Sequence, residues 1–292
     1  MTLCKDLIDE AIAELHGYGS TQDLVTPLTN PIGAADTSFT VDFTFGQSAG
    51  LTAGFVEIDS EQLYVTNVNQ TNGLCTVANG FGRGFSDTTA ASHSAGALIK
   101  SQPKFPRIWV FNQLNEVITS LYPQLFAVQQ YTTTVKFPSN EYPLPSMPID
   151  ILTVEWQDPL SNWRKAPAWH FDSFDGNLRL GSGCMIGRPL RIQYATRPTP
   201  FVAETDNFTV TGLPSTCHDV LYLGVVERQL PGLDISRAQA STIEGSDRSR
   251  VVPANAGLTS ASFIQKKFQD RLRTESQALR RQYRPRLHKV FG

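Results

Sequence analysis

The stretch GFVEIDSEQLYVTNVNQTNGLCTVA, residues 54–78, shows the pattern of consecutive short strands. Apolar and polar residues alternate within it, which is typical of strands with one buried face. Asp59-Ser60 and Asn72-Gly73 are turn signals between the alternating parts. The stretch therefore predicts three short strands, at Gly54–Asp59, Glu61–Val68 and Gly73–Ala78.

The residues on both sides extend this pattern into a small all-β module. Upstream, residues 39–45 alternate in the same way, and downstream the glycine-rich run NGFGRG begins at Asn79. We expect the module to occupy residues 25–100. A second β-rich block is expected at 131–205, where repeated prolines keep the strands short.

Helical periodicity appears before, between and after these blocks. Apolar residues at helical spacing predict helices at Leu3–Leu15, Arg107–Pro123 and Thr216–Leu230, with Thr2 as a cap of the first and Pro231-Gly232 as the end of the third. A last helix is predicted from near Ser260 to Pro285.

These patterns predict an α+β chain with a helical core, formed by the N-terminal, middle and C-terminal helices, and two inserted or appended β-rich modules. The expected parts are core elements at 1–24 and 101–130, β modules at 25–100 and 131–205, a core helix and loop at 206–259, and a basic C-terminal helix and tail at 260–292.

Charge is distributed unevenly along the chain. Residues Ala261–Gly292 contain nine Lys or Arg and two acidic residues, a net charge of +7, and the remainder carries −9. Such asymmetry is typical of an interaction segment.

The last helix also has an apolar stripe, formed by Ile264, Phe268, Leu272, Leu279 and Tyr283. The stripe argues against a simple nucleic-acid arm, and the basic residues argue against an ordinary core helix. We therefore predict docking into a groove with acidic walls, while packing of the stripe on the chain's own core stays open. The candidate partner-binding residues are Ile264, Lys266, Lys267, Phe268, Arg271, Leu272, Arg273, Arg280, Arg281, Arg284 and Arg286.

No catalytic constellation stands out, so we expect no enzyme, no cofactor and no metal. The five histidines form no metal-binding spacing, and GFGRG at Gly80–Gly84 is neither a P-loop nor a dinucleotide fingerprint. Cys217-His218 point about 100° apart on a helix and cannot pair as nucleophile and base. Glu57 and Asp59 could form a glycosidase pair on one strand face, although a solvated face is the preferred interpretation.

The three tryptophans at positions 156, 163 and 169 could form a glycan or partner platform, although packing between strands is favoured. The four scattered cysteines are expected to be reduced, buried thiols. With no secretory signal and no long apolar run in the sequence, we expect a soluble protein made in a cytosol.

The run from Val56 to Ile99 resembles a small β module that recurs in tailed-bacteriophage virion proteins. It departs from that pattern at Ala78–Phe81. These extra residues lie between the strand that ends near Val77 and the arginine-glycine pair of the pattern, Arg83-Gly84. The matching positions are Ile58, Asp59, Glu61, Val65, Val68, Val77, Gly82, Arg83, Gly84, Thr88, Ala90, His93 and Gly96.

The order of helices, including LNEVITSLYP at Leu114–Pro123, resembles the head-to-tail connector (adaptor) family. The resemblance implies a structural protein of the virion neck, made in the host cytoplasm, that forms a twelve-fold ring beneath the portal. Its partners would be the portal protein, the next neck or tail protein, further copies of itself, and packaged DNA passing non-specifically through the lumen, with no membrane. The rivals are a peripheral tail or adhesion protein that binds host glycan through Trp163 or Trp169, and a glycan hydrolase.

Overall fold

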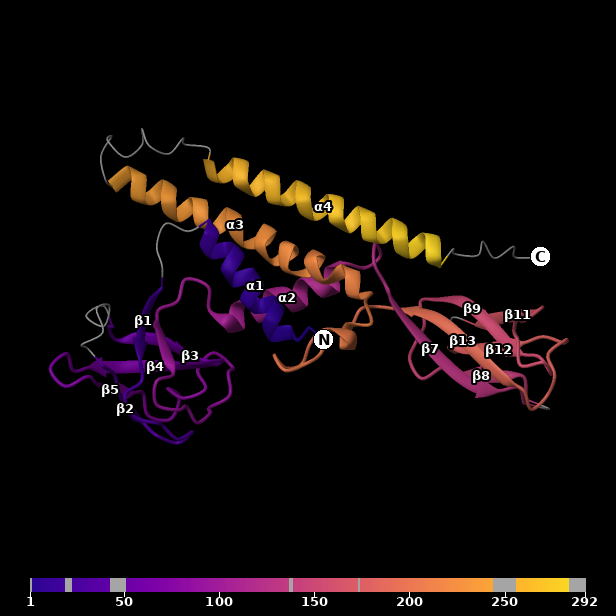
Figure 1. Ribbon diagram of the computed structural model, residues 1–292, viewed down its shortest axis with the longest axis horizontal. Helices are drawn as coiled ribbons and strands as arrows, with labels where there is room; N and C mark the ends of the chain where they lie inside the picture. Colours follow the sequence, from indigo (N-terminus) through magenta and orange to yellow (C-terminus); the bar gives the residue numbers. More distant parts are fainter. Residues whose placement is uncertain are drawn as a thin grey trace. The chain divides into compact units, whose positions relative to one another are not determined.

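The computed structural model describes residues 2–18, 23–42, 51–136, 139–172, 174–243 and 256–283. In this part of the chain, four α-helices and 13 strands are present, and the strands form three antiparallel sheets (Figure 1). The helices are α1 (Cys4–Gly17), α2 (Arg107–Ser120), α3 (His218–Ile243) and α4 (Ala256–Gln282).

The chain divides into two compact units. The boundary between them falls inside α1, inside α2 and inside α3. The first unit comprises Met1–Leu7, Leu114–Pro231 and Ser246–Gly292, and the second comprises Ile8–Gln113 and Gly232–Gly245.

The second unit contains a six-stranded sheet with the order β1-β6-β3-β4-β5-β2. A bridge between Leu28 and Val41, just beyond the edge strands β1 and β2, brings the two edges of the sheet together. The sheet therefore curls around one apolar core, in which Val56, Leu63 and Ile99 are fully buried. Its strands are β1 (Leu24–Pro27), β2 (Ser38–Thr40), β3 (Gly54–Ile58), β4 (Glu61–Val68), β5 (Leu74–Val77) and β6 (Leu98–Ser101).

The first unit contains two sheets that share a second apolar core. Leu178, Leu190 and Ile192 are fully buried in it. The four-stranded sheet has the order β10-β9-β13-β7, and the three-stranded sheet has the order β11-β12-β8. Their strands are β7 (Ala127–Thr134), β8 (Glu141–Pro143), β9 (Asp150–Gln157), β10 (Trp163–Lys165), β11 (Trp169–Asp172), β12 (Asn177–Leu180) and β13 (Pro189–Thr196).

The expectation of a helical core carrying β modules is wrong. The chain is a mixed fold, rich in strand, with three antiparallel sheets. Each β region encloses an apolar core of its own, so neither is an appendage of the helices. Several strands of three or four residues, such as β1, β8, β10 and β11, were not predicted, because so short a segment completes at most two cycles of alternation. Of the strand expected at 39–45, β2 covers the start, and residues 43–50 lie outside the described part.

The helix predictions are correct in position and wrong at several ends. The helices predicted at Leu3–Leu15 and Arg107–Pro123 are confirmed as α1 and α2. The predicted end of the third helix at Pro231-Gly232 is wrong, because α3 continues to Ile243. The last helix starts at Ala256, four residues earlier than predicted. The loop predicted at Gly245–Gly257 lies outside the described residues up to 255, and its last two residues belong to α4.

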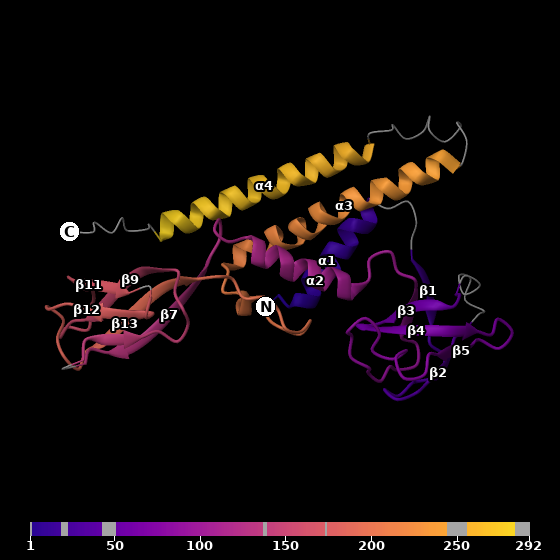
Figure 2. The ribbon, with the colours of Figure 1, turned by 180° about the vertical axis from the view of Figure 1, so that it is seen from behind.

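α2, α3 and α4 approach one another closely at Gly224 of α3. A methyl group at this position would lie 2.7 Å from a methyl carbon of Val117 in α2 and 3.1 Å from the ring of Phe268 in α4. The first half of α3, up to Pro231, lies beside α4 in both ribbon views (Figure 1, Figure 2). The absence of a side chain at Gly224 therefore permits this three-helix contact.

Replacing Gly224 with leucine should destabilise the protein by about 1–3 kcal/mol, because the added atoms must displace Val117 and Phe268. Urea unfolding followed by far-ultraviolet circular dichroism measures the effect. Ala278→Leu, at an exposed position of α4, is the matched control and should change stability by less than about 0.5 kcal/mol. Equal stability of the two variants would contradict the close contact.

Candidate partner-binding face of α4

The apolar stripe of α4 packs against the chain itself. Ile264, Leu272 and Leu279 are buried, and Phe268 is half-buried with its ring next to Gly224. These residues therefore belong to the protein's own core. Of the two interpretations left open by the sequence, the structure favours internal packing for the stripe.

Arg271 also points to the chain's own body. Its guanidinium contacts the Asp219 carboxylate of α3 at 2.5 and 3.1 Å, and the Glu275 carboxylate of α4 at 2.9 Å. The hydrogen bond with Asp219 raises the pKa of Arg271 above its usual value. Glu275 in turn accepts a hydrogen bond of 2.6 Å from the Thr216 hydroxyl. This set of contacts fixes α4 on α3.

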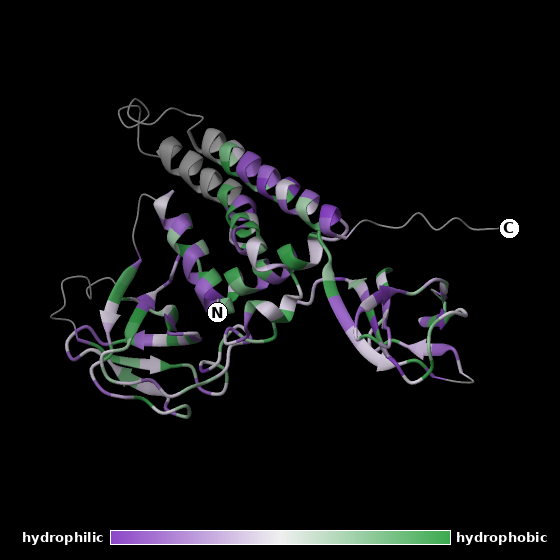
Figure 3. Cartoon of the chain, turned by 45° about the vertical axis from the view of Figure 1, so that its right-hand side comes forward, coloured by the Kyte–Doolittle hydropathy of each residue, from purple (hydrophilic) through white to green (hydrophobic). Residues whose placement is uncertain are grey.

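The opposite side of α4 is exposed and basic. Lys266, Lys267, Arg273, Arg280 and Arg281 are all exposed, and none of them pairs with a carboxylate within the described part of the chain. We call these five residues the basic face. Asp270 is the one exposed acidic residue described on this helix, so the exposed side carries a net charge of +4. Figure 3 shows much of α4 in the hydrophilic colour.

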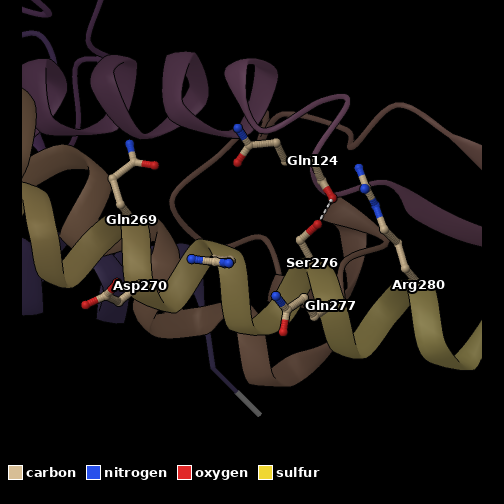
Figure 4. Close-up of a pocket in the computed structure, with 7 residues that line it drawn as sticks. Gln124, Gln269, Asp270, Ser276, Gln277 and Arg280 are labelled. Atoms are coloured by element: carbon tan, nitrogen blue, oxygen red, sulfur yellow. Dashed lines mark hydrogen bonds between the residues drawn. The ribbon is translucent and has the colours of Figure 1, made fainter.

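A hollow of about 530 Å³ lies along this side of α4. Its described lining is polar: Gln124, Gln269, Asp270, Arg273, Ser276, Gln277 and Arg280. The Ser276 hydroxyl donates a hydrogen bond of 2.8 Å to the Gln124 carbonyl, which ties α4 to the segment before β7. In Figure 4, Gln269 and Arg280 extend from α4 on the side where Gln124 lies.

The structure thus separates the candidate residues into two groups. Ile264, Phe268, Leu272 and Arg271 contact the protein's own core, and the basic face points outward. Arg284 and Arg286 lie outside the described residues. The neutral residues Gln124, Gln269 and Gln277 were missed, because an isolated glutamine gives no signal in a sequence.

A second polar cluster, inside the six-stranded sheet, gathers several residues that carry the resemblance to phage virion proteins. The Arg83 guanidinium donates to both oxygens of Glu61, at 2.8 and 3.0 Å, and to the backbone carbonyls of Gly33, Asp36 and Ala91. We call Arg83, Glu61 and His93, together with the exposed Asp59 at their edge, the buried network.

His93 completes the buried network. One ring nitrogen lies 2.8 Å from the Asp59 carboxylate and the other lies 2.8 Å from the Glu61 carboxylate. Because both nitrogens of this buried side chain have carboxylate partners, His93 is not placed to take a proton from a substrate. The arrangement supports a stabilising role.

The ionisation of Glu61 reflects these contacts. Burial raises the pKa of its carboxyl, but hydrogen bonds from Arg83, the Ala91 amide, His93 and the Gly84 amide outweigh burial and lower the pKa to about 2. Glu61 is therefore ionised at neutral pH, although its side chain is only 1% exposed.

The residues considered for catalysis have different partners and surroundings in the structure. Glu57 is buried, accepts a hydrogen bond from the Arg107 amide at the start of α2 and contacts Lys100, whereas Asp59 lies in the turn after β3. The two carboxylates therefore have separate roles. Burial raises the pKa of the Cys217 thiol to about 12, so it stays protonated and is a poor nucleophile.

The tryptophans do not form one platform. Trp156 and Trp169 pack against the core of the first unit, whereas Trp163 is partly exposed on β10. The Arg191 guanidinium lies 4.4 Å from the centre of the Trp163 ring, a cation–π contact. Packing therefore accounts for two of the three rings.

Cys4, Cys75 and Cys217 are buried, as expected, whereas Cys184 is only half-buried. In the described ranges, no group of three His, Cys, Asp or Glu side chains is placed to hold a metal ion. No helix among the described residues combines the length and apolar character needed to cross a bilayer. The sequence matches no protein-family model and no curated protein.

Proposed function

We propose that this protein is a structural component of a tailed-phage virion, a head-to-tail adaptor that docks onto the portal protein through the basic face of α4. One observation carries the proposal: five exposed cations lie on one helix with no carboxylate partner in the described part of the chain. Surface cations without internal partners are available to an acidic surface on another molecule.

The way α4 is held supports a docking role. The buried stripe and the contacts of Arg271 and Ser276 fix the helix along its length. A helix that is already ordered loses little conformational freedom on binding, so more of the interaction energy appears as affinity. The basic face is thus presented on a rigid element.

The buried network supports the assignment to virion proteins. Asp59, Glu61, Arg83 and His93 are positions of the phage-like pattern, and they meet in one cluster although up to 34 residues separate them in sequence. Their contacts give a physical reason why these four residue types occur together in this chain. The adaptor role, a ring of about twelve copies with DNA passing through its lumen, and the location at the virion neck follow from the resemblance and remain part of the proposal.

Portal retention tests the proposal. A variant with all five residues of the basic face changed to glutamine should bind an immobilised portal ring roughly 5- to 5000-fold more weakly, because each exposed ion pair contributes about 0.2–1 kcal/mol. The control changes Lys136, Lys165 and Arg179, which are exposed on the sheets of the first unit, to glutamine. Equal retention of both variants, or no retention of the unaltered protein, would refute docking by this face.

The alternative function is adhesion to a host glycan, which now depends on Trp163. Its ring is partly exposed, but Arg191 already lies over it. Binding to a glycan array that is lost in Trp163→Ala, together with no portal binding, would favour this alternative.

A further inference from the structure

The polar hollow on α4 offers a more specific site within the basic face. Arg273 and Arg280 both line it, together with the side-chain amides of Gln269 and Gln277. Each guanidinium carries five N–H donors in a fixed planar fork, so it can bind a carboxylate through two hydrogen bonds.

The spacing of the two arginines suggests the shape of the ligand. They are seven positions apart in the sequence, which is about two turns of helix and about 10.5 Å along the axis. A second helix with acidic residues at positions i and i+7 presents two carboxylates at the same spacing on one face. We infer that this hollow is the anchor point of the basic face and that it binds two carboxylates from an acidic helix of a partner protein. This inference rests on the proposed docking function and adds to it the partner's chemistry.

The lining favours a protein partner over the DNA backbone. Asp270 is exposed and lines the same hollow, so a row of phosphates would meet a negative charge there. A protein helix can place a neutral or basic residue opposite Asp270 while its carboxylates meet Arg273 and Arg280. Glutamines can donate to a carboxylate and accept from an amide, which also suits a mixed protein surface.

The hollow should contribute more than the rest of the basic face. Ser276 of the lining is hydrogen-bonded to Gln124, and Leu272 and Leu279 of the same helix are buried, so the backbone that carries both arginines is fixed. Lys266 and Lys267 lie outside the lining, on open surface, where single ion pairs contribute little.

A peptide probe tests the hollow independently of portal. The probe is a fluorescent alanine-rich helix with two glutamates seven residues apart, and the control peptide has them five residues apart, on different faces. The full-length protein should bind the first peptide at least about threefold more tightly, and Arg273→Gln/Arg280→Gln should remove that preference, whereas Lys266→Gln/Lys267→Gln should retain it. Equal binding of the two peptides, or equal effects of the two variants, would overturn the inference.

The same variants, measured with portal and with duplex DNA, test two claims separately. One is docking onto the portal by the basic face, and the other is binding of an acidic helix in the hollow. The arginine variant should weaken portal binding by at least about 10-fold and the lysine variant by less than about threefold. If both weaken it equally, docking stands and the hollow is not its anchor. If peptide selectivity holds but portal does not bind, the adaptor function fails and the acidic-helix site stands. A loss of DNA binding specific to the arginine variant, with no change for the peptides, would assign the hollow to phosphates and overturn the inference.

Discussion

Replacing Glu61 with glutamine is expected to lower the stability of the six-stranded sheet by about 3–5 kcal/mol. The Glu61 carboxylate is 1% exposed and accepts five hydrogen bonds or close polar contacts, from Arg83, Gly84, Ala91 and His93. Glutamine keeps the shape of the side chain but removes its charge. The buried Arg83 guanidinium would then lack its counter-charge, and the new amide N–H groups would face other donors.

The expected loss is a large fraction of the total stability of a domain, which is about 5–15 kcal/mol. Urea unfolding followed through the methyl resonances of Leu63 and Val65 measures it locally, because both side chains are buried in this sheet. The matched control is Glu141→Gln, which removes an ion pair with Arg179 that is about half exposed. That control should cost less than about 1 kcal/mol. A Glu61 variant as stable as the control would show that the buried network contributes no net stability.

The position of the buried network could be predicted only in part from the sequence. The resemblance selected Asp59, Glu61, Arg83 and His93, but periodicity alone favoured a solvated strand face around Asp59. The buried network instead depends on contacts across 22 to 34 residues of chain, at the end of a tight turn with positive φ at Asp59. Alternation of apolar and polar residues predicts which side chains of a regular strand are buried. It does not predict the contact of Asp59, in the turn, with His93, or the burial of Glu61, the first residue of β4.

The last helix shows the opposite case, in which a correct pattern allowed two interpretations. The apolar stripe predicted one buried face, and Ile264, Leu272 and Leu279 are buried. The sequence could not decide whether a partner or the chain itself covers that face, because the covering residues on α2 and α3 are distant in sequence. Gly224 gave no signal of its role, since only the close approach of Val117 and Phe268 makes it necessary.

Acid is expected to weaken the six-stranded sheet through the same carboxylate. The folded pKa of Glu61, about 2, lies below the ordinary value of 4.5, so its ionised form is stabilised by folding. That contribution is complete above pH 4.5 and is lost as the pH falls toward about 2. Because one pKa unit corresponds to about 1.36 kcal/mol, the loss attributable to Glu61 is about 3 kcal/mol.

Glu57, in the same sheet, acts in the opposite direction. Burial raises its pKa, although the Arg107 amide, Lys100 and Arg107 oppose the shift, so protonation of Glu57 favours the folded state as the pH falls. The net acid dependence of the unaltered protein therefore understates the contribution of Glu61. The difference in stability between the unaltered protein and Glu61→Gln cancels the contribution of Glu57, because Glu57 is present in both.

The measurement is the stability difference between the unaltered protein and Glu61→Gln, taken from the Leu63 and Val65 resonances at several pH values between about 6 and about 2.5. The difference should be constant above about pH 5 and shrink steadily below pH 4.5, since the unaltered protein loses the ionised carboxylate that the variant never had. A difference that stays constant to the lowest pH would mean that the variant's loss arises from altered shape or packing. In that case the charge of Glu61 would not hold Arg83 and His93 in place. The hydrogen bonds from Arg83 to backbone carbonyls would then stabilise the buried network instead.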